Sequence, residues 1–171
     1  MSHKEAVYER LDGLGIPYER HEHALVHTMA DCLALPYAAP DVTFCKNILL
    51  CNRQQTAYWL FVTEPLKPFR TAVVSKLLGT SRLSFAPSEQ LMPLLGLESG
   101  SLSPLALWFD TGKRMTLALD RDIRREGRIA FHPCDATSTV IFSQQVFWNQ
   151  VLPALTASPV LLTLPGADEQ V

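Results

Sequence analysis

Apolar and polar residues alternate with a period of two over several short stretches of the chain, and this pattern predicts β-strands. The stretch TFCKNILLC (43–51) is largely apolar on both faces, so we expect a well-buried strand there. A polar turn at 52–55 leads into a second strand at 58–62, and the two are expected to form a hairpin. Further strands are predicted at Leu83–Phe85, 128–133 and 138–143, and a second hairpin pairs Leu105–Phe109 with Met115–Leu119.

Helix signals separate these strands. Ser2 followed by Glu5 forms a capping-box pattern at the start of a helix that the glycines at 13 and 15 end. Thr28 is expected to cap a short helix that carries Asp31 in its first turn. Further helices are predicted before Gly79, after Pro87 and after Ser143.

Helices and strands thus follow one another irregularly, with hairpins among them. This order is typical of the α+β class, so we predict one domain over residues 1–171. We expect a single curved, mostly antiparallel sheet with flanking helices. The segment 156–171 has no clear period and either packs as a strand or forms a flexible tail.

Composition narrows the class of protein. Hydrophobic residues make up 47% and charged residues 19% of the 171 residues, which is typical of a soluble globular domain. No stretch approaches the roughly 18 uninterrupted apolar residues of a membrane span, so no membrane association is expected. No export signal is evident, so we expect a cytoplasmic protein whose four cysteines are free thiols. The formal net charge of -2 means that nucleic acid could be bound only by a local basic patch.

Lys46 is a cation inside the apolar stretch 43–51. One interpretation is a strand-end lysine whose stem lies on apolar surface while its ammonium group reaches water. The other places the ammonium group at the mouth of a pocket, where it can polarise a carbonyl group or bind a phosphate.

Two further segments contain residues that could take part in binding or catalysis. In GSLSP (100–104), Gly100 permits an unusual backbone conformation and Pro104 fixes the exit, so the loop could aim several N–H groups at one oxygen. His132, in AFHPCDAT, sits at a strand end and could orient a substrate or relay a proton. Taken singly, each is more often a plain turn or a structural histidine.

Other kinds of site find less support. His21, His23, His27, Asp31 and Cys32 lie close together in the sequence, but their spacing fits known zinc sites poorly, so no metal or other cofactor is expected. No nucleophile elbow, phosphate-binding P-loop or dinucleotide fingerprint is present. Cys45 and Cys51 lie in an apolar strand that disfavours a thiolate.

The order of these segments resembles a known family. HTMADC (27–32), CKNILLC (45–51), SKLLGTSRLSFAPSEQLMPLLGLESGSLSPLAL (75–107) and FHPCDAT (131–137) together resemble the prolyl-tRNA synthetase-associated and YbaK-like editing domains. The free-standing Ala-tRNA(Pro) deacylases are the most similar branch. The likeness runs from about Tyr18 to Trp148. It implies a mixed α/β fold with a pocket beside the sheet and hydrolysis of the ester that joins a wrong amino acid to tRNA(Pro).

The resemblance also assigns roles to residues. Lys46, Gly100 and His132 match the family's pocket lysine, its glycine loop and its histidine, and we expect them to be catalytic. Alanine would enter the pocket while the larger proline is excluded, by a wall that includes Met29, Phe44 and Leu102. The expected substrate-binding residues are Thr28, Met29, Phe44, Asn47, Ser101, Leu102, Ser103 and Pro104.

Contact with tRNA needs a basic patch. Lys113, Arg114, Arg124 and Arg125 are the candidates, and Lys67, Arg70, Lys76 and Arg82 could extend the patch. The alternative for each is a solvated charged surface.

The chain departs from the family pattern at three positions. Ala136 stands where the pattern has asparagine, and Trp108 and Phe109 replace a smaller aliphatic and a polar residue.

Three functions therefore stay open at this stage. The first is a hydrolase that removes alanine, or another small residue such as serine or cysteine, from tRNA(Pro). The second is a non-catalytic module that binds tRNA or prolyl-tRNA synthetase. The third is a regulator that binds a metal or an amino acid through the segment from His21 to Cys32.

Overall fold

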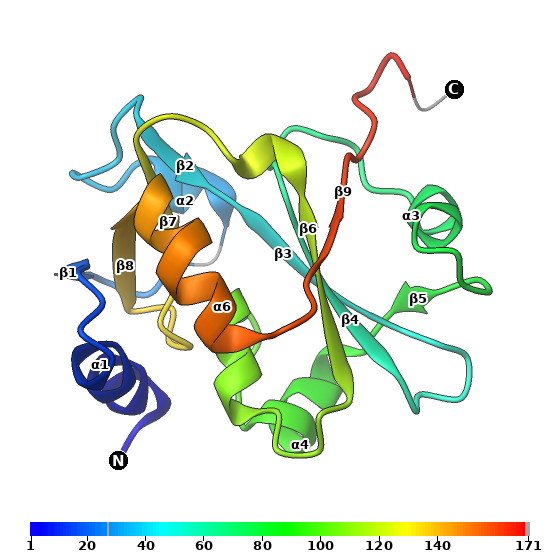
Figure 1. Cartoon of the computed structure of the whole chain (residues 1–171), viewed down its shortest axis with the longest axis horizontal. Coiled ribbons are helices and arrows are strands. Elements are labelled where there is room, and N and C mark those ends of the chain that lie inside the picture. The colour runs from blue at the N-terminus through cyan, green and yellow to red at the C-terminus, as the bar shows by residue number, and fades with distance from the viewer. Residues whose placement is uncertain (27, 170–171) are drawn as a thin grey trace.

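Two β-sheets, linked by the segment 42–51, form the framework of the molecule (Figure 1). The computed structural model describes residues 1–26 and 28–169. The first sheet has the order β1 (Glu19–Glu22), β8 (Ser138–Ser143), β7 (Arg128–Phe131) and β2 (Val42–Phe44). The second has the order β5 (Ser84–Phe85), β3 (Lys46–Cys51), β4 (Tyr58–Thr63), β6 (Met115–Asp120) and β9 (Val160–Leu162).

Short helices surround the sheets, and their caps follow the sequence signals. The Ser2 hydroxyl accepts a hydrogen bond from the backbone N–H of Glu5, and the Thr28 hydroxyl accepts one from that of Asp31. The α-helices are α1 (His3–Gly13), α2 (Met29–Leu33), α3 (Thr71–Leu77), α4 (Leu91–Leu95), α5 (Gln144–Val146) and α6 (Leu152–Leu155). A π-helical turn, η4 (Phe147–Val151), joins α5 to α6, and 3₁₀ turns occupy η1 (Ser88–Gln90), η2 (Pro104–Phe109) and η3 (Arg121–Ile123). No helix in the described part of the chain has the length and apolar character needed to cross a bilayer.

The expected α+β class is confirmed, but the single curved sheet is in fact two mixed sheets. The stretch 42–51 is not one strand: it leaves the first sheet at Cys45 and continues as β3 in the second. Three pairings are parallel, namely β2 with β7, β4 with β6 and β6 with β9. The apolar pattern continues through Cys45 without interruption, so it carries no sign that the strand changes partner.

The predicted strand at Leu105–Phe109 is wrong, because Pro104–Phe109 forms the 3₁₀ turn η2. Pro104 stands at the first helical position, and the Ser103 hydroxyl accepts a hydrogen bond from the N–H of Leu105. These are helix-start signals, and they outweigh the apolar character of the run.

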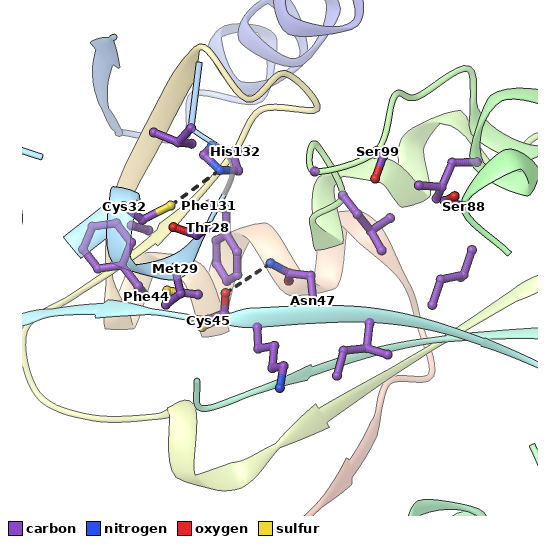
Figure 2. Close-up of a pocket in the computed structure, with 18 of the residues that line it drawn as sticks. Thr28, Met29, Cys32, Phe44, Cys45, Asn47, Ser88, Ser99, Phe131 and His132 are labelled. Atoms are coloured by element: carbon purple, nitrogen blue, oxygen red, sulfur yellow. Dashed lines mark hydrogen bonds between the residues drawn. The ribbon is translucent and has the colours of Figure 1, made fainter. Parts of the chain in front are cut away.

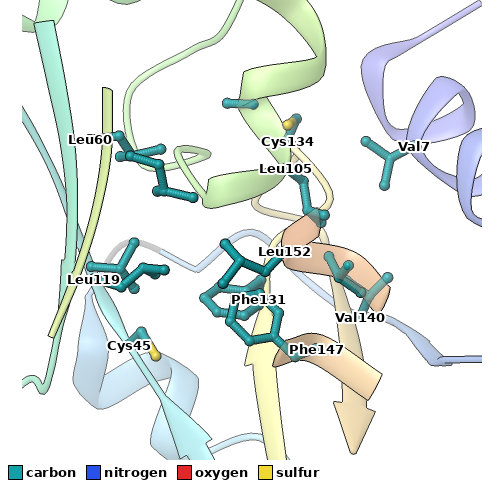
Figure 3. Packing of buried hydrophobic residues seen from close by; sticks show 14 of the residues in the cluster. Val7, Cys45, Leu60, Leu105, Leu119, Phe131, Cys134, Val140, Phe147 and Leu152 are labelled. Carbon is teal, nitrogen blue, oxygen red and sulfur yellow. The ribbon is translucent and has the colours of Figure 1, made fainter. Parts of the chain in front are cut away.

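The main core lies between the sheets and the C-terminal helices. Figure 3 shows Leu60 and Leu119 from the second sheet facing Phe131 from the first, with Phe147 and Leu152 beside them. All of these side chains are buried, so this core fixes the two sheets relative to each other.

The C-terminal segment is held by a buried ion pair. The Lys67 ammonium group donates to Asp120 at 2.8 Å, to Asp122 at 2.7 Å and to the carbonyl oxygen of Leu164 at 2.7 Å. Asp120 is fully buried and also accepts from the Thr63 hydroxyl at 2.6 Å. Within the tail, residues 160–162 pair with β6 as β9, and the Leu164 side chain is buried.

Candidate active site

A cavity of about 650 Å³ opens where the two sheets meet. Its wall takes residues from α2, from the crossing between β2 and β3, from the loop that precedes η2 and from the ends of β7 and β8. Figure 2 shows His132, Cys32 and Thr28 at one side of this wall, Ser88 and Ser99 at the other, and Asn47 between them. Eight of the expected site residues line it: Thr28, Met29, Phe44, Lys46, Asn47, Gly100, Leu102 and His132.

The cavity reaches both faces of β3 because one edge of that strand is open. The neighbouring strand β5 pairs only with Leu50 and Cys51, and Ala86 adds one hydrogen bond to the carbonyl oxygen of Leu49. Lys46 and Asn47 come earlier in β3, and successive side chains of a strand point to opposite faces. Both residues therefore border one cavity from opposite sides of the strand.

Lys46 is half-buried in this wall. Among the described residues its ammonium group has no hydrogen-bond or ion-pair partner, and none of the described lining residues is acidic. The cavity therefore presents an uncompensated positive charge to whatever enters it. Such a charge favours a phosphate, a carboxylate or a polarised carbonyl oxygen.

Gly100 borders the cavity with a φ of +90°, a conformation that side chains disfavour. A Cβ added at Gly100 would meet nothing within 4 Å, so the glycine is required by the backbone conformation and not by lack of space. The sequence expectation of an unusual backbone at this loop is met.

Asn47 carries an unsatisfied acceptor in the cavity wall. Its side-chain N–H donates to the carbonyl oxygen of Cys45 at 3.4 Å, which fixes the orientation of the amide. Its Oδ1 atom is shielded from solvent and has no hydrogen-bond partner among the described residues. A buried acceptor without a partner costs about 1–3 kcal/mol of folding free energy. The site therefore has an acceptor to offer to an N–H or O–H group of a ligand.

His132 is held as a neutral imidazole. Its Nδ1 lies 2.8 Å from the carbonyl oxygen of Ser138, which can only accept, so Nδ1 carries the proton and Nε2 is an acceptor. Burial lowers the pKa of His132. The histidine is therefore suited to accept a proton or to orient a water molecule.

Cys32 also lines the cavity, beside His132, and it is not among the site residues predicted from the sequence. Its Sγ lies 3.9 Å from His132 Nε2, across 100 positions of sequence (Figure 2). Burial raises the pKa of the Cys32 thiol, so the pair is a thiol beside a neutral imidazole. This is not the thiolate–imidazolium pair of a cysteine nucleophile.

Three expected substrate-binding residues do not line the cavity: Ser101, Ser103 and Pro104. All three are buried behind the loop. The Ser101 hydroxyl donates to the carbonyl oxygen of Glu98 at 2.6 Å, and Ser103 caps η2. The two serines shape the loop that carries Gly100 and do not face a ligand, because the backbone engages their hydroxyl groups, and Pro104 is buried as the first residue of η2.

The four candidate tRNA-binding residues do not form one patch. Lys113 and Arg114 precede β6, whereas Arg124 and Arg125 follow it, so the whole strand separates the two pairs. Arg125 forms an ion pair with Glu64, and Arg124 lies over the ring of Trp148 at 5.3 Å. Lys67, predicted to extend the patch, forms ion pairs with Asp120 and Asp122, which neutralise its charge.

The histidines near the N-terminus have other contacts. His21 stacks on Tyr37 with ring centroids 4.0 Å apart, and His23 Nε2 lies 2.9 Å from the Thr139 hydroxyl. His27 lies outside the described residues. Within the described residues no three side chains of His, Cys, Asp or Glu are placed to share a metal ion.

The departures from the family pattern also lie away from the cavity. Ala136 is buried in a satellite core, Trp108 donates to the carbonyl oxygen of Ala154 at 3.2 Å, and Phe109 packs on His3. None of the three is a lining residue of the described cavity.

Comparison with known proteins identifies the family and the fold of the chain. Residues 23–147 match the family model of the aminoacyl-tRNA editing domain. The prolyl-tRNA editing protein ProX of Acetoanaerobium sticklandii is 27% identical over 145 residues, covering 85% of this chain and 88% of that protein. The prolyl-tRNA synthetase associated domain-containing protein 1 of Danio rerio is 27% identical over 140 residues, covering 80% and 74%. A solved structure of a candidate trans-editing enzyme for prolyl-tRNA synthetase has the same fold, with a TM-score of 0.73 at 15% identity over 98% of this chain and 99% of that one.

Proposed function

Because the chain belongs to the aminoacyl-tRNA editing domain family, we propose that it removes alanine from mischarged tRNA(Pro). The coarser statement, that it is an aminoacyl-tRNA deacylase of the prolyl-tRNA editing type, follows from the family and from its ProX relative. The observation that carries the finer proposal is the single cavity that brings together Lys46, Gly100 and His132.

The reaction needs a water molecule to attack the acyl carbon while the ribose oxygen leaves. In our proposal the N–H groups of the loop at Gly100 bind the acyl carbonyl oxygen, where negative charge develops. Lys46 holds a ribose or phosphate oxygen of the terminal nucleotide. The attacking water loses a proton, and the departing ribose oxygen gains one, so the products are free alanine and a tRNA with an intact 3′ hydroxyl.

Two neutral groups complete the site. His132 Nε2 accepts a hydrogen bond from the attacking water in place of the weak donor it has in Cys32, and the neighbouring ribose hydroxyl of the substrate assists it. Asn47 Oδ1 accepts a hydrogen bond from the α-ammonium group or from the ribose hydroxyl, which supplies the partner that the amide oxygen lacks. The substrate's own hydroxyl explains how hydrolysis proceeds without a protein nucleophile.

Selection of alanine rests on exclusion of the larger proline ring. Met29, Phe44 and Leu102 line the cavity and are the proposed wall. Apolar walls discriminate by about 1–3 kcal/mol per methylene, so a bulky residue at the acyl end is enough to reject proline. Met29→Ala should therefore begin to hydrolyse Pro-tRNA(Pro). If Pro-tRNA(Pro) stays intact with Ala variants at all three positions, the wall is elsewhere.

The substrate and its setting follow from the reaction. The partner is aminoacylated tRNA(Pro), and prolyl-tRNA synthetase is a candidate second partner because it makes the mischarged species. We place the protein in the cytoplasm, where tRNA is charged.

The proposal is tested by a deacylation panel. Ala-, Ser-, Cys- and Pro-tRNA(Pro) are incubated separately with the protein, and loss of the ester is followed with time. Faster loss from Ala-tRNA(Pro) than from the other three supports the proposal. Preferred loss of serine or cysteine corrects the amino acid, and protection of all four esters without turnover would show a binding module instead.

A further inference from the structure

Phe85 is an exposed aromatic residue in the cavity wall. Its side chain is 57% exposed, although it lines the cavity. The ring of Phe69 lies 5.8 Å away, centroid to centroid, and Phe69 in turn packs edge-on against the fully buried Phe61 at 5.4 Å. One part of the Phe85 ring is thus held by the core, and the rest is left open to a ligand at the rim.

The backbone holds Phe85 firmly in this position. It lies on β5, opposite Leu50 of β3, and the N–H of the next residue, Ala86, donates to the carbonyl oxygen of Leu49 at 2.9 Å. Phe85 therefore flanks the open edge of β3, and its strand β5 lies on the opposite side of the molecule from α2 (Figure 1). If the acyl group lies near Met29 and His132, the nucleotide that carries it lies toward Phe85.

The chain around Phe85 is strongly biased in charge. From Pro65 to Ser88 there is no acidic residue, while Lys67, Arg70, Lys76 and Arg82 are basic. Lys67 is neutralised by Asp120 and Asp122, whereas Lys76 and Arg82 are exposed. Surfaces that bind single-stranded nucleic acid combine exposed cations with open aromatic rings, and this segment of the chain carries both.

One hydrogen bond brings the two cations to the same neighbourhood. The N–H of Leu83 donates to the Ser75 hydroxyl at 2.9 Å, and that hydroxyl donates to the carbonyl oxygen of Thr71 at 2.6 Å. Lys76 follows Ser75 and Arg82 precedes Leu83, so each cation adjoins this link between α3 and the start of β5. The buried Leu83 side chain anchors the link in the core.

We propose that Phe85 stacks on the terminal adenine of the tRNA and that Lys76 and Arg82 bind the phosphates that precede it. The inference rests on the proposed function, and it assigns the part of the site that receives the nucleotide and not the amino acid. Every base has an aromatic face, and phosphates carry no sequence information. This surface therefore adds affinity for any single-stranded 3′ end and does not distinguish tRNA(Pro) from other tRNAs.

The test measures binding without hydrolysis. An uncharged RNA microhelix that ends in CCA is compared with one that lacks the terminal adenosine, by fluorescence anisotropy. The wild-type protein should bind the complete end about 5- to 150-fold more tightly, the range that one stacked base supplies. Phe85→Ala should bind both RNAs equally weakly, and Phe85→Tyr should restore the preference because it keeps the ring.

The role of the two cations is tested with the double variant Lys76→Glu, Arg82→Glu. Its affinity for both microhelices should fall, and the slope of log Kd against log salt should decrease by about 1.4, the share of two phosphates of a single strand. Leu14→Ala and Arg10→Glu are the matched controls, because both residues are exposed and lie at or next to α1, far from α3 (Figure 1). Melting temperatures confirm that all variants fold.

Either of two results overturns the inference: a wild-type protein that binds the two microhelices equally, or a Phe85→Ala variant that keeps the preference. Failure of the proposed function is a separate outcome, because it appears as intact Ala-tRNA(Pro) in the deacylation panel. The binding preference can persist in that case, since it does not depend on which ester is cleaved.

Discussion

Asn47 offers a direct test of whether the cavity sacrifices stability to bind a ligand. Replacing it by leucine removes the shielded Oδ1 acceptor, whose lack of a partner costs about 1–3 kcal/mol. The same change loses the 3.4 Å hydrogen bond to Cys45, which is long and worth about 0.5–1 kcal/mol. The neighbour on the same face of β3, Leu49, is buried and apolar, so a leucine side chain has an apolar surface to pack on.

The balance predicts that Asn47→Leu stabilises the protein by about 1 kcal/mol. For a chain of this length the melting temperature should rise by about 2–4 °C. Deacylation of Ala-tRNA(Pro) should fall at the same time, because the substrate loses its acceptor. The assay is a thermal melt together with a single-turnover deacylation time course on the same preparation.

Asn52 provides the matched control, since its amide is fully engaged. Its Oδ1 accepts from the N–H groups of Thr56 and Ala57 at 2.9 and 3.2 Å, and its Nδ2 donates to the Thr56 hydroxyl at 2.9 Å. Asn52→Leu should therefore lower the melting temperature and leave the deacylation rate unchanged. A lower melting temperature for Asn47→Leu, or a wild-type rate, would refute the reasoning about Asn47.

Three further predictions follow from the buried ion pair, the loop and the histidine. Lys67→Met leaves the fully buried Asp120 carboxylate without its cation and should lower the free energy of unfolding, measured in urea, by about 3–5 kcal/mol. Asp122→Asn, which changes the exposed partner of Lys67, should lower it by under about 1 kcal/mol. Gly100→Ala, at φ +90°, should cost about 1–2 kcal/mol of strain and slow deacylation, and Gly13→Ala is the control in a helix. Burial lowers the pKa of His132 below the ordinary histidine value of about 6.5, so the rate should stay level through that pH and fall only as the pH approaches the lower pKa of the folded protein.

His132 also determines in which direction the stability of the protein changes with pH. Its pKa is lower in the folded than in the unfolded chain, so the unfolded chain binds more protons between the two values. Its contribution to stability is present above about pH 6.5 and is lost as the pH falls toward the folded pKa. A His132→Gln variant should lose this part of the pH dependence. Equal pH profiles for the two proteins, in rate and in melting temperature, would contradict the role of the neutral imidazole.

Local signals in the sequence were sufficient for most elements. The caps at Ser2 and Thr28 and the hairpin of β3 and β4 depend on residues a few positions apart, and the structure has them. The change of sheet at Cys45 depends on which distant strands compete for the backbone of β2 and β3. No local pattern encodes that competition, because both partners accept the same apolar alternation.

The site residues likewise divide into those that the sequence predicts and those that depend on distant contacts. The order of motifs placed Lys46, Gly100 and His132 in one cavity, whereas single motifs did not. Ser101 and Ser103 looked like ligand contacts, because a sequence does not show that their hydroxyls are used by the backbone. Cys32 and Phe85 reach the cavity through contacts across the chain, although both lie within the motifs that carried the family resemblance.

The central claim is that an uncompensated lysine in this cavity drives hydrolysis of a small aminoacyl ester. Single-turnover deacylation of Ala-tRNA(Pro) by the wild-type protein and by Lys46→Met tests it most directly, with melting curves to show that both are folded. The account predicts a rate about 100-fold lower for Lys46→Met, because an aminoacyl end that the ammonium group no longer holds is misplaced for attack by water. Equal rates for the two proteins would contradict it.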